Sequence, residues 1–91
     1  MADRRDGAKL PDMTKTISFR GVDVRYDSRE IHLWRTQRAI ASAGHDPYGG
    51  YEAIDRILCG RADEVADAVG GTDADMSALL AALTEAEGAK N

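Results

Sequence analysis

The sequence has few of the residues that build catalytic or metal centres. Its 91 residues include one cysteine, Cys59, and two histidines, His32 and His45. A single cysteine cannot form a disulfide within the chain and fits a reducing cytoplasm. His32 has no histidine or cysteine one helical turn away, so the sequence offers no cluster of metal ligands. Cys59 ends a predicted helix, where the dipole disfavours a thiolate, and we interpret it as a small apolar side chain near the core. We expect a non-enzymatic protein with no catalytic residue, metal or cofactor.

Long apolar runs are also missing. No segment approaches the ~18 apolar residues of a membrane span. Residues 1–13, MADRRDGAKLPDM, lack the apolar core of a signal peptide. We therefore expect a cytoplasmic protein that makes no membrane contact. The same residues mix charges of both signs with glycine and proline, which predicts a flexible N-terminal arm, and we expect residues 89–91 to fray.

The chain has a formal net charge of −4, and its charges are divided unevenly between its two halves. Residues 1–45 carry nine lysines and arginines against six aspartates and glutamates, whereas residues 46–91 carry three against ten. The acidic half argues against general nucleic-acid binding, which needs a basic surface to displace counterions. It also allows copies of the chain to associate head to tail, and so small a domain gains from burying further surface.

Alternating polarity in the segment TKTISFRGVDVRYD predicts a β-hairpin over residues 15–26. A turn at Arg20-Gly21 would be of type I′ and would give Arg20 a positive φ. Because a lone hairpin is barely stable in water, we expect it to pack against helices. The register places four apolar residues on one side of the ribbon: Ile17, Phe19, Val22 and Val24.

A helix is predicted over residues 28–43. Asp27 and Glu30 have the spacing of a capping box, and Gly44 suits the C-terminal cap. We expect Trp34 to anchor the core between this helix and the hairpin. The inward face is predicted to hold Leu33, Trp34, Gln37, Ile40 and Ala41, with Ile31 at its edge.

Glycines separate three further segments with helical periodicity, which predict helices over about 47–59, 61–69 and 73–87. Asp46 and Pro47 suit the start of the first, and Thr72 or Asp73 the cap of the last. The apolar stripes are Tyr51, Ile54 and Leu58; Ala62, Val65, Ala66 and Val69; and Met76, Leu79, Leu80 and Leu83.

Two patterns in this acidic half resemble ligand sites. Gly70-Gly71 precedes a helix, as in anion-binding loops, but Asp73 and Asp75 in the first turn would repel a phosphate. The other carboxylates fall opposite the apolar stripes or at helix starts, which predicts a solvated acidic face rather than acid–base chemistry.

Together these elements predict one α+β domain over residues 14–88 that is mainly helical, with an N-terminal β-hairpin followed by about four short helices. An all-helical bundle is the alternative. We expect the last stripe, Met76, Leu79, Leu80 and Leu83, to be shared between the core and a partner interface.

A basic strip surrounds the first predicted helix and allows a second class of function. A strand followed by helices with such a strip is compatible with a small DNA-binding regulator, although a regulator of the ribbon type would pair single strands across a dimer. Solvated arginines, some paired with the acidic half, are the simpler interpretation. The strip consists of Arg25, Arg29, Arg35 and Arg38, with His32.

The order of these segments resembles the tail assembly chaperones of long-tailed phages and prophages, especially those of Gram-positive hosts. The matching features are the ribbon ISFRGVDVRYD, a helix with a tryptophan, the segment Ile57-Leu58-Cys59-Gly60, an acidic helix, and a last helix that opens with Thr72-Asp73-Ala74-Asp75. The resemblance covers residues 14–88, and Cys59 stands where leucine is usual in that family.

The resemblance implies a role in the bacterial host cytoplasm. Such chaperones bind the tape-measure protein, a long helical chain with exposed apolar surface, and keep it soluble while tail-tube subunits assemble. The family has no catalytic residues to carry over. We therefore expect a phage tail assembly chaperone whose partners are the tape-measure protein, possibly the tail-tube protein, and further copies of itself. The alternatives are a small DNA-binding regulator and a structural tail or head-tail component.

Overall fold

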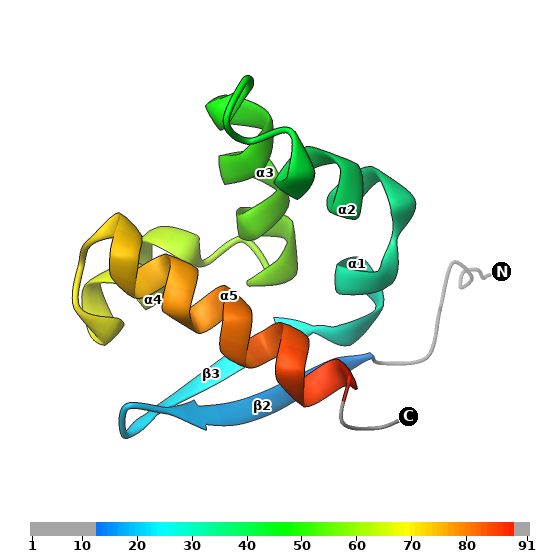
Figure 1. The fold of residues 1–91 in the computed structure, drawn as a ribbon. Helices are drawn as coiled ribbons and strands as arrows, with labels where there is room; N and C mark the ends of the chain where they lie inside the picture. The colour runs from blue at the N-terminus through cyan, green and yellow to red at the C-terminus, as the bar shows by residue number, and fades with distance from the viewer. Residues whose placement is uncertain (1–12, 89–91) are drawn as a thin grey trace, which may run out of the picture.

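The computed structural model describes residues 13–88 and has the predicted α+β, mainly helical architecture, in which a two-stranded antiparallel hairpin precedes five helices (Figure 1). The predicted arm, apart from Met13, and the tail at 89–91 lie outside the described residues. Across 13–88, no helix is both long and apolar enough to cross a membrane. The elements are β2 (Thr14–Phe19), β3 (Val22–Asp27), α1 (Ser28–His32), α2 (Trp34–Ala41), α3 (Pro47–Ile57), α4 (Ala62–Val69) and α5 (Asp73–Gly88).

The hairpin has the predicted register, with Phe19 opposite Val22 and Ile17 opposite Val24. Both turn residues have positive φ, 53° at Arg20 and 79° at the following glycine, as a type I′ turn requires. Three contacts hold the Arg20 side chain. Its Nη1 donates to the Val69 carbonyl at 3.0 Å and to the Asp75 carboxylate at 2.5 Å, and its guanidinium lies over the Phe19 ring, 4.9 Å from the centroid. The turn is thereby tied to the end of α4 and to the first turn of α5.

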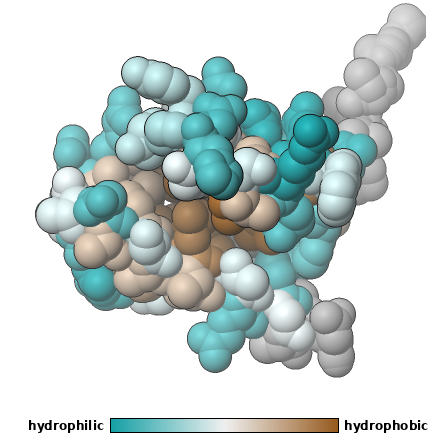
Figure 2. Space-filling view, turned by 45° about the horizontal axis from the view of Figure 1, so that its top comes forward, coloured by the Kyte–Doolittle hydropathy of each residue, from teal (hydrophilic) through white to brown (hydrophobic). Residues whose placement is uncertain are grey.

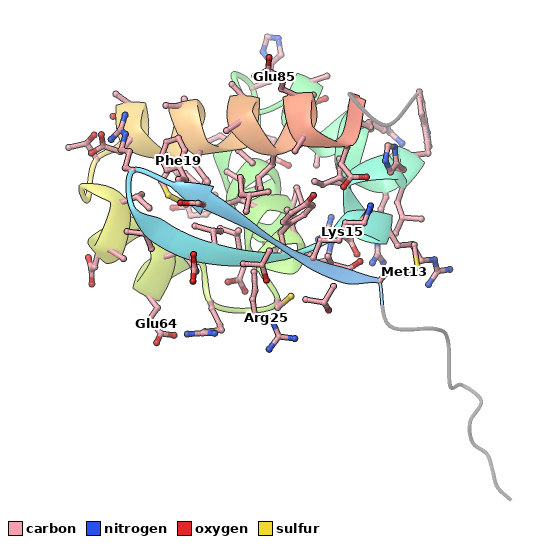
Figure 3. The ribbon with its side chains drawn as sticks, turned by 90° about the horizontal axis from the view of Figure 1, so that it is seen from below. Met13, Lys15, Phe19, Arg25, Glu64 and Glu85 are labelled. Carbon is pink, nitrogen blue, oxygen red and sulfur yellow. The ribbon has the colours of Figure 1, made fainter. Side chains whose placement is uncertain are left out.

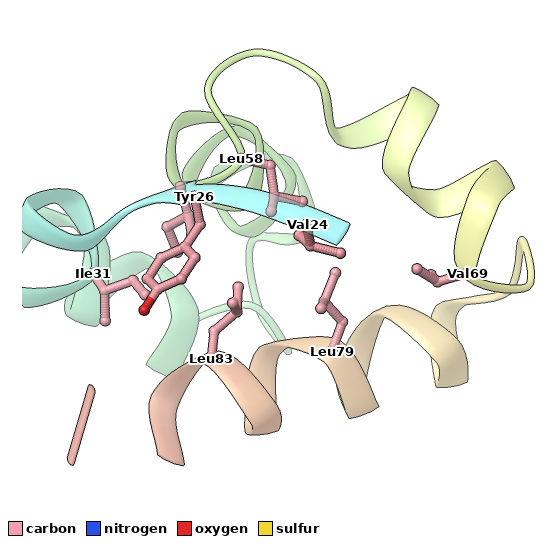
Figure 4. Close-up of a cluster of buried hydrophobic side chains, with 8 residues drawn as sticks. Val24, Tyr26, Ile31, Leu58, Val69, Leu79 and Leu83 are labelled. Carbon is pink, nitrogen blue, oxygen red and sulfur yellow. The ribbon is translucent and has the colours of Figure 1, made fainter. Parts of the chain in front are cut away.

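The core lies between the hairpin and α5, which runs along one face of the ribbon (Figure 3). β3 contributes Val24 and Tyr26, and α5 contributes Leu79 and Leu83, which are fully buried. Such a side chain contributes about 1.5–3 kcal/mol relative to exposure. Figure 4 shows these side chains converging with those of the other helices; the full cluster is Val24, Tyr26, Ile31, Ile57, Leu58, Val69, Leu79 and Leu83.

The prediction of one unbroken helix over 28–43 was wrong. The chain is extended at Leu33, with φ −71° and ψ 139°, so α1 ends at His32 and α2 begins at Trp34. In an unbroken helix, residues 30 and 35 would lie about 140° apart around the axis. The break lets Arg35 and Thr36 both donate to the buried Glu30 carboxylate. That carboxylate is therefore not part of a full capping box, although Asp27 accepts from the backbone of residues 29 and 30 as predicted.

The inward face predicted for this segment was wrong at three of its five positions, whereas Ile40 is partly buried and packs against the core as predicted. Trp34 is 77% exposed, so it does not anchor the core, whereas Thr36 is fully buried. The break at Leu33 turns α2 about its axis relative to α1, and this places Thr36 inward. Gln37 and Ala41 are exposed, and Ile31 belongs to the core rather than to its edge. Gly44 is not the C-terminal cap, because α2 ends at Ala41 and Ser42 occupies the cap position.

Helices α3 and α5 begin at the predicted capping residues. Asp46 accepts from the backbone N–H of Gly49, and Pro47 is the first helical residue of α3. Thr72 and Asp75 hydrogen-bond reciprocally at the start of α5: the Thr72 hydroxyl accepts from the Asp75 N–H at 3.1 Å, and the Asp75 carboxylate accepts from the Thr72 N–H at 3.2 Å. α3 ends at Ile57 rather than at 59, α4 covers 62–69, and α5 extends to Gly88.

Candidate partner-binding groove

An open groove of about 1070 Å³ lies between α3, α4 and the N-terminal half of α5. Its floor is apolar and its edges are polar. In the space-filling view, hydrophobic side chains gather in a depression that hydrophilic ones surround (Figure 2). The apolar side chains that line it include Ile40, Ile54, Ala62, Ala66, Met76 and Leu80.

The last predicted stripe divides between this groove and the core. Leu79 and Leu83 are fully buried against the hairpin. Met76 and Leu80, one helical turn apart, are only partly buried and line the groove. Because the two pairs occupy adjacent strips of one helix, Met76 and Leu80 are the members of this stripe that a partner in the groove could contact.

The opposite wall of the groove comes from α3. Ile54 is partly buried there, whereas Tyr51 lines the groove and is 63% exposed. The prediction that Tyr51 belongs to a buried stripe was therefore wrong. Only Leu58 of that stripe enters the core. An exposed tyrosine at a groove edge offers a partner a large, rigid contact area.

The α3–α4 connection sets the position of α4. Cys59 has φ 60° and Gly60 φ 78°, so the chain turns sharply directly after the buried Leu58. Cys59 is exposed, which corrects its interpretation as a side chain near the core. Asp55 then accepts from the backbone N–H of Ala62 at 3.1 Å, and this contact satisfies one backbone donor in the first turn of α4 from outside that helix.

The rim of the groove is acidic. Arg61 is the one cationic side chain among the lining residues that the structure describes, and it donates two hydrogen bonds to Glu64, at 2.9 and 3.1 Å. The pKa of Glu64 is lowered by this hydrogen-bonded guanidinium. Within residues 13–88, Glu52, Asp63 and Asp73 make no ion pair. The carboxylates on the rim are Glu52, Asp55, Asp63, Glu64 and Asp73.

A buried carboxylate at the far end of α5, Glu87, joins three elements outside the groove. It accepts from the Tyr26 hydroxyl at 2.6 Å and from the Ser28 hydroxyl at 2.7 Å. His32 Nε2 lies 3.0 Å from it and Lys15 Nζ 3.4 Å. Burial would raise the pKa of Glu87, but these donors outweigh it and lower that pKa to about 2. Burial, with the Glu87 hydrogen bond and charge, raises the pKa of Tyr26 to about 12.

A second buried carboxylate, Glu30 on α1, holds α2 and α3. It accepts from Arg35 at 3.0 and 3.2 Å, from the Thr36 hydroxyl at 2.5 Å and from Arg56 at 3.0 Å. Burial opposes ionisation here too, yet the hydrogen bonds from these three residues lower the pKa of Glu30 to about 2. Sequence reasoning missed Glu87 and assigned Glu30 to a capping box, because the partners of both carboxylates lie on other elements. A glutamate among apolar positions late in a helix was the one available signal.

The predicted basic strip is partly neutralised by these two clusters. Arg35 pairs with Glu30 and His32 with Glu87. The side chains of Arg25, Arg29 and Arg38 are exposed and form no ion pair within the part of the chain that the structure describes. The same part contains no group of three or more histidine, cysteine, aspartate or glutamate side chains placed to hold a metal ion.

No protein-family model, curated protein sequence or solved structure matches this chain. The functional argument therefore rests on the groove itself. An apolar floor between three helices, bordered by charge, has the form of a site for an amphipathic helix.

Proposed function

We propose that this protein is a non-enzymatic assembly chaperone that holds an amphipathic helix of a client protein in the groove between α3, α4 and α5. The observation that carries the proposal is the exposure of Met76 and Leu80 to this groove, beside the fully buried Leu79. Partly exposed apolar side chains on the groove floor can pack against the apolar face of an incoming helix.

The resemblance of the chain to phage tail assembly chaperones supports a specific client. A tape-measure protein is a long helical chain whose apolar surface stays exposed until tail-tube subunits enclose it. A groove that covers a helical stripe would keep such a client soluble. Arg20 and the hairpin turn, tied to α4 through the Val69 carbonyl, would hold the α4 wall in place during binding.

Genome context provides the first test. A long, helix-rich reading frame directly downstream, with an overlap and a slippery site, is the expected neighbour of a tail assembly chaperone. A toxin gene or an operator-flanked regulator in its place would count against this role and favour the small DNA-binding regulator, whose candidate surface is the exposed set of Arg25, Arg29 and Arg38.

Co-expression with that downstream protein provides the direct test. Wild type should keep the client soluble and elute with it in size-exclusion chromatography. Leu80→Asp places a charge on the groove floor and should abolish the complex. Ala81→Asp is the matched control, since Ala81 is the next residue of α5, is exposed and does not line the groove. Loss of the complex in both variants, or in neither, would refute groove binding, provided circular dichroism shows that both are folded.

A further inference from the structure

The rim of the groove has an excess of negative charge that residues 13–88 do not neutralise. Among these residues, five carboxylates line it against one guanidinium, and that guanidinium is held by Glu64. Glu52, Asp63 and Asp73 are all exposed, and none forms an ion pair within residues 13–88. They come from three helices, α3, α4 and α5 in turn, so the negative charge surrounds the apolar floor instead of lying along one edge.

We infer that the groove selects a basic amphipathic helix, whose apolar stripe is flanked by lysine or arginine. This inference rests on the proposed function, because it names the charge of the helix that the groove takes. The apolar floor would supply most of the affinity, and the rim would exclude acidic helices by like-charge repulsion and speed the encounter with basic ones.

The length of a lysine or arginine side chain fits this arrangement. The apolar part of its stem can lie over the groove wall while the cationic end reaches a rim carboxylate. Glu52 stands on α3 beside Tyr51, whose exposed ring offers such a stem an apolar surface. Asp63 lies on a different wall of the groove, in the first turn of α4. A helix in the groove could place its two basic flanks against carboxylates of different walls.

Two matched peptides test the inference. Both are fluorescein-labelled helices with leucine at i, i+3, i+4 and i+7; one carries lysine at the flanking positions and the other carries glutamate there. Fluorescence anisotropy with the full-length chain should show the lysine peptide binding at least about 10-fold more tightly, with a preference that shrinks at high salt. Equal binding of the two peptides would overturn the inference, whereas binding of neither would overturn the groove as a helix site.

Charge reversal on the rim tests whether the rim carboxylates cause the preference for the lysine peptide. Glu52→Lys with Asp63→Lys should weaken the lysine peptide about 10-fold and remove the preference over the glutamate peptide. The control pair, Asp67→Lys with Glu85→Lys, has the same net charge and reverses exposed carboxylates that do not line the groove; Figure 3 shows Glu85 on the side of α5 away from the hairpin. The control should stay within about 2-fold of wild type. An equal loss of affinity for the lysine peptide in the control pair would show that the preference depends only on the net charge of the protein. That result would overturn the inference.

A single variant keeps the test valid if the rim double variant, Glu52→Lys with Asp63→Lys, fails to fold. Asp63 lies in the first turn of α4, where a lysine opposes the helix dipole, but Glu52 lies within α3. Glu52→Lys alone should therefore stay folded and weaken binding of the lysine peptide about 3-fold.

Sedimentation of the peptide-free protein tests the rival occupant, a second copy of the chain. If wild type and the control pair formed oligomers and the Glu52→Lys/Asp63→Lys variant were monomeric, the groove would be a self-association site. That result would overturn the inference.

Discussion

Replacement of Glu87 by glutamine should destabilise the protein by an amount that depends on pH. Glutamine keeps the shape of the side chain but removes the charge that Tyr26, Ser28, His32 and Lys15 surround. The hydroxyl donors would then face a neutral amide, and Lys15 would lose its counter-charge. The loss should be full at pH 7 and should disappear in strong acid.

The magnitude and its pH window follow from the pKa of Glu87. Burial would raise this pKa above its ordinary 4.5, but the donors to the carboxylate lower it to about 2 in the folded protein. Because the folded pKa is the lower one, the stabilisation is present above pH 4.5 and is lost as the pH falls through 2. The difference between these pKa values corresponds to about 3 kcal/mol. Since the side chain is 5% exposed, solvent screening takes little from that figure.

Urea denaturation followed by circular dichroism, repeated from pH 7 to pH 2, measures the effect. Glu87→Gln should be about 3 kcal/mol less stable than wild type at pH 7, and the two unfolding curves should converge near pH 2. Glu85→Gln, two residues earlier on α5 and exposed, is the control and should change stability by less than about 0.5 kcal/mol at any pH. A deficit in Glu87→Gln that stays constant from pH 7 to pH 2 would refute an ionised, charge-stabilised Glu87.

Three further substitutions probe the fold by the same urea measurement. Leu79→Ala should cost about 2–5 kcal/mol because the side chain is fully buried in the core, and a cost below about 1 kcal/mol would show that Leu79 faces solvent. Thr36→Val should cost about 1–3 kcal/mol because it removes the buried hydroxyl that donates to Glu30; an unchanged stability would mean that this hydrogen bond is absent. Trp34→Ala should lie within about 0.5 kcal/mol of wild type because the indole is 77% exposed, and a larger loss would place it in a packed contact.

The hairpin could be predicted from sequence because its determinants are local. The alternation of polarity and the Arg20-Gly21 turn together fix the register, and the pairing of Phe19 with Val22 follows from that turn alone. Helix starts were predictable for the same reason, since Asp46 and Thr72 cap residues no more than three positions away. Local chemistry determined these features, so a single sequence was sufficient.

The break at Leu33 could not be predicted because its cause is distant in sequence. Helical periodicity continues through Leu33, and the residue is an ordinary helix former. What favours the extended conformation is the set of hydrogen bonds that the break permits, above all from Thr36 and Arg56 to the buried Glu30 carboxylate. Arg56 lies 26 positions from Glu30, so no local pattern connects them. The error over Trp34 follows from the same break.

The sequence predicted the apolar residues of α5 but not which of them line the groove. The stripe on α5 identified Met76, Leu79, Leu80 and Leu83 as one apolar face, but periodicity cannot say which strip of that face meets the hairpin. The three-dimensional arrangement decides it: Leu79 and Leu83 converge in the core with Val24 and Tyr26 of β3 (Figure 4), and the sharp turn after Leu58 precedes α4, which lines the groove beside the other strip.

The positions of the two buried carboxylates explain how an exposed apolar groove can coexist with a uniquely packed fold in so small a chain. Glu87 and Glu30 hold α1 to the hairpin, α2, α3 and the C-terminal end of α5, through hydrogen bonds that alternative packings would leave unmade. Leu80 lies seven residues before Glu87, about 10 Å along the helix axis, and at that separation energetic effects are close to additive. The groove end of α5 can therefore keep apolar side chains available to a partner while the opposite end fixes the fold.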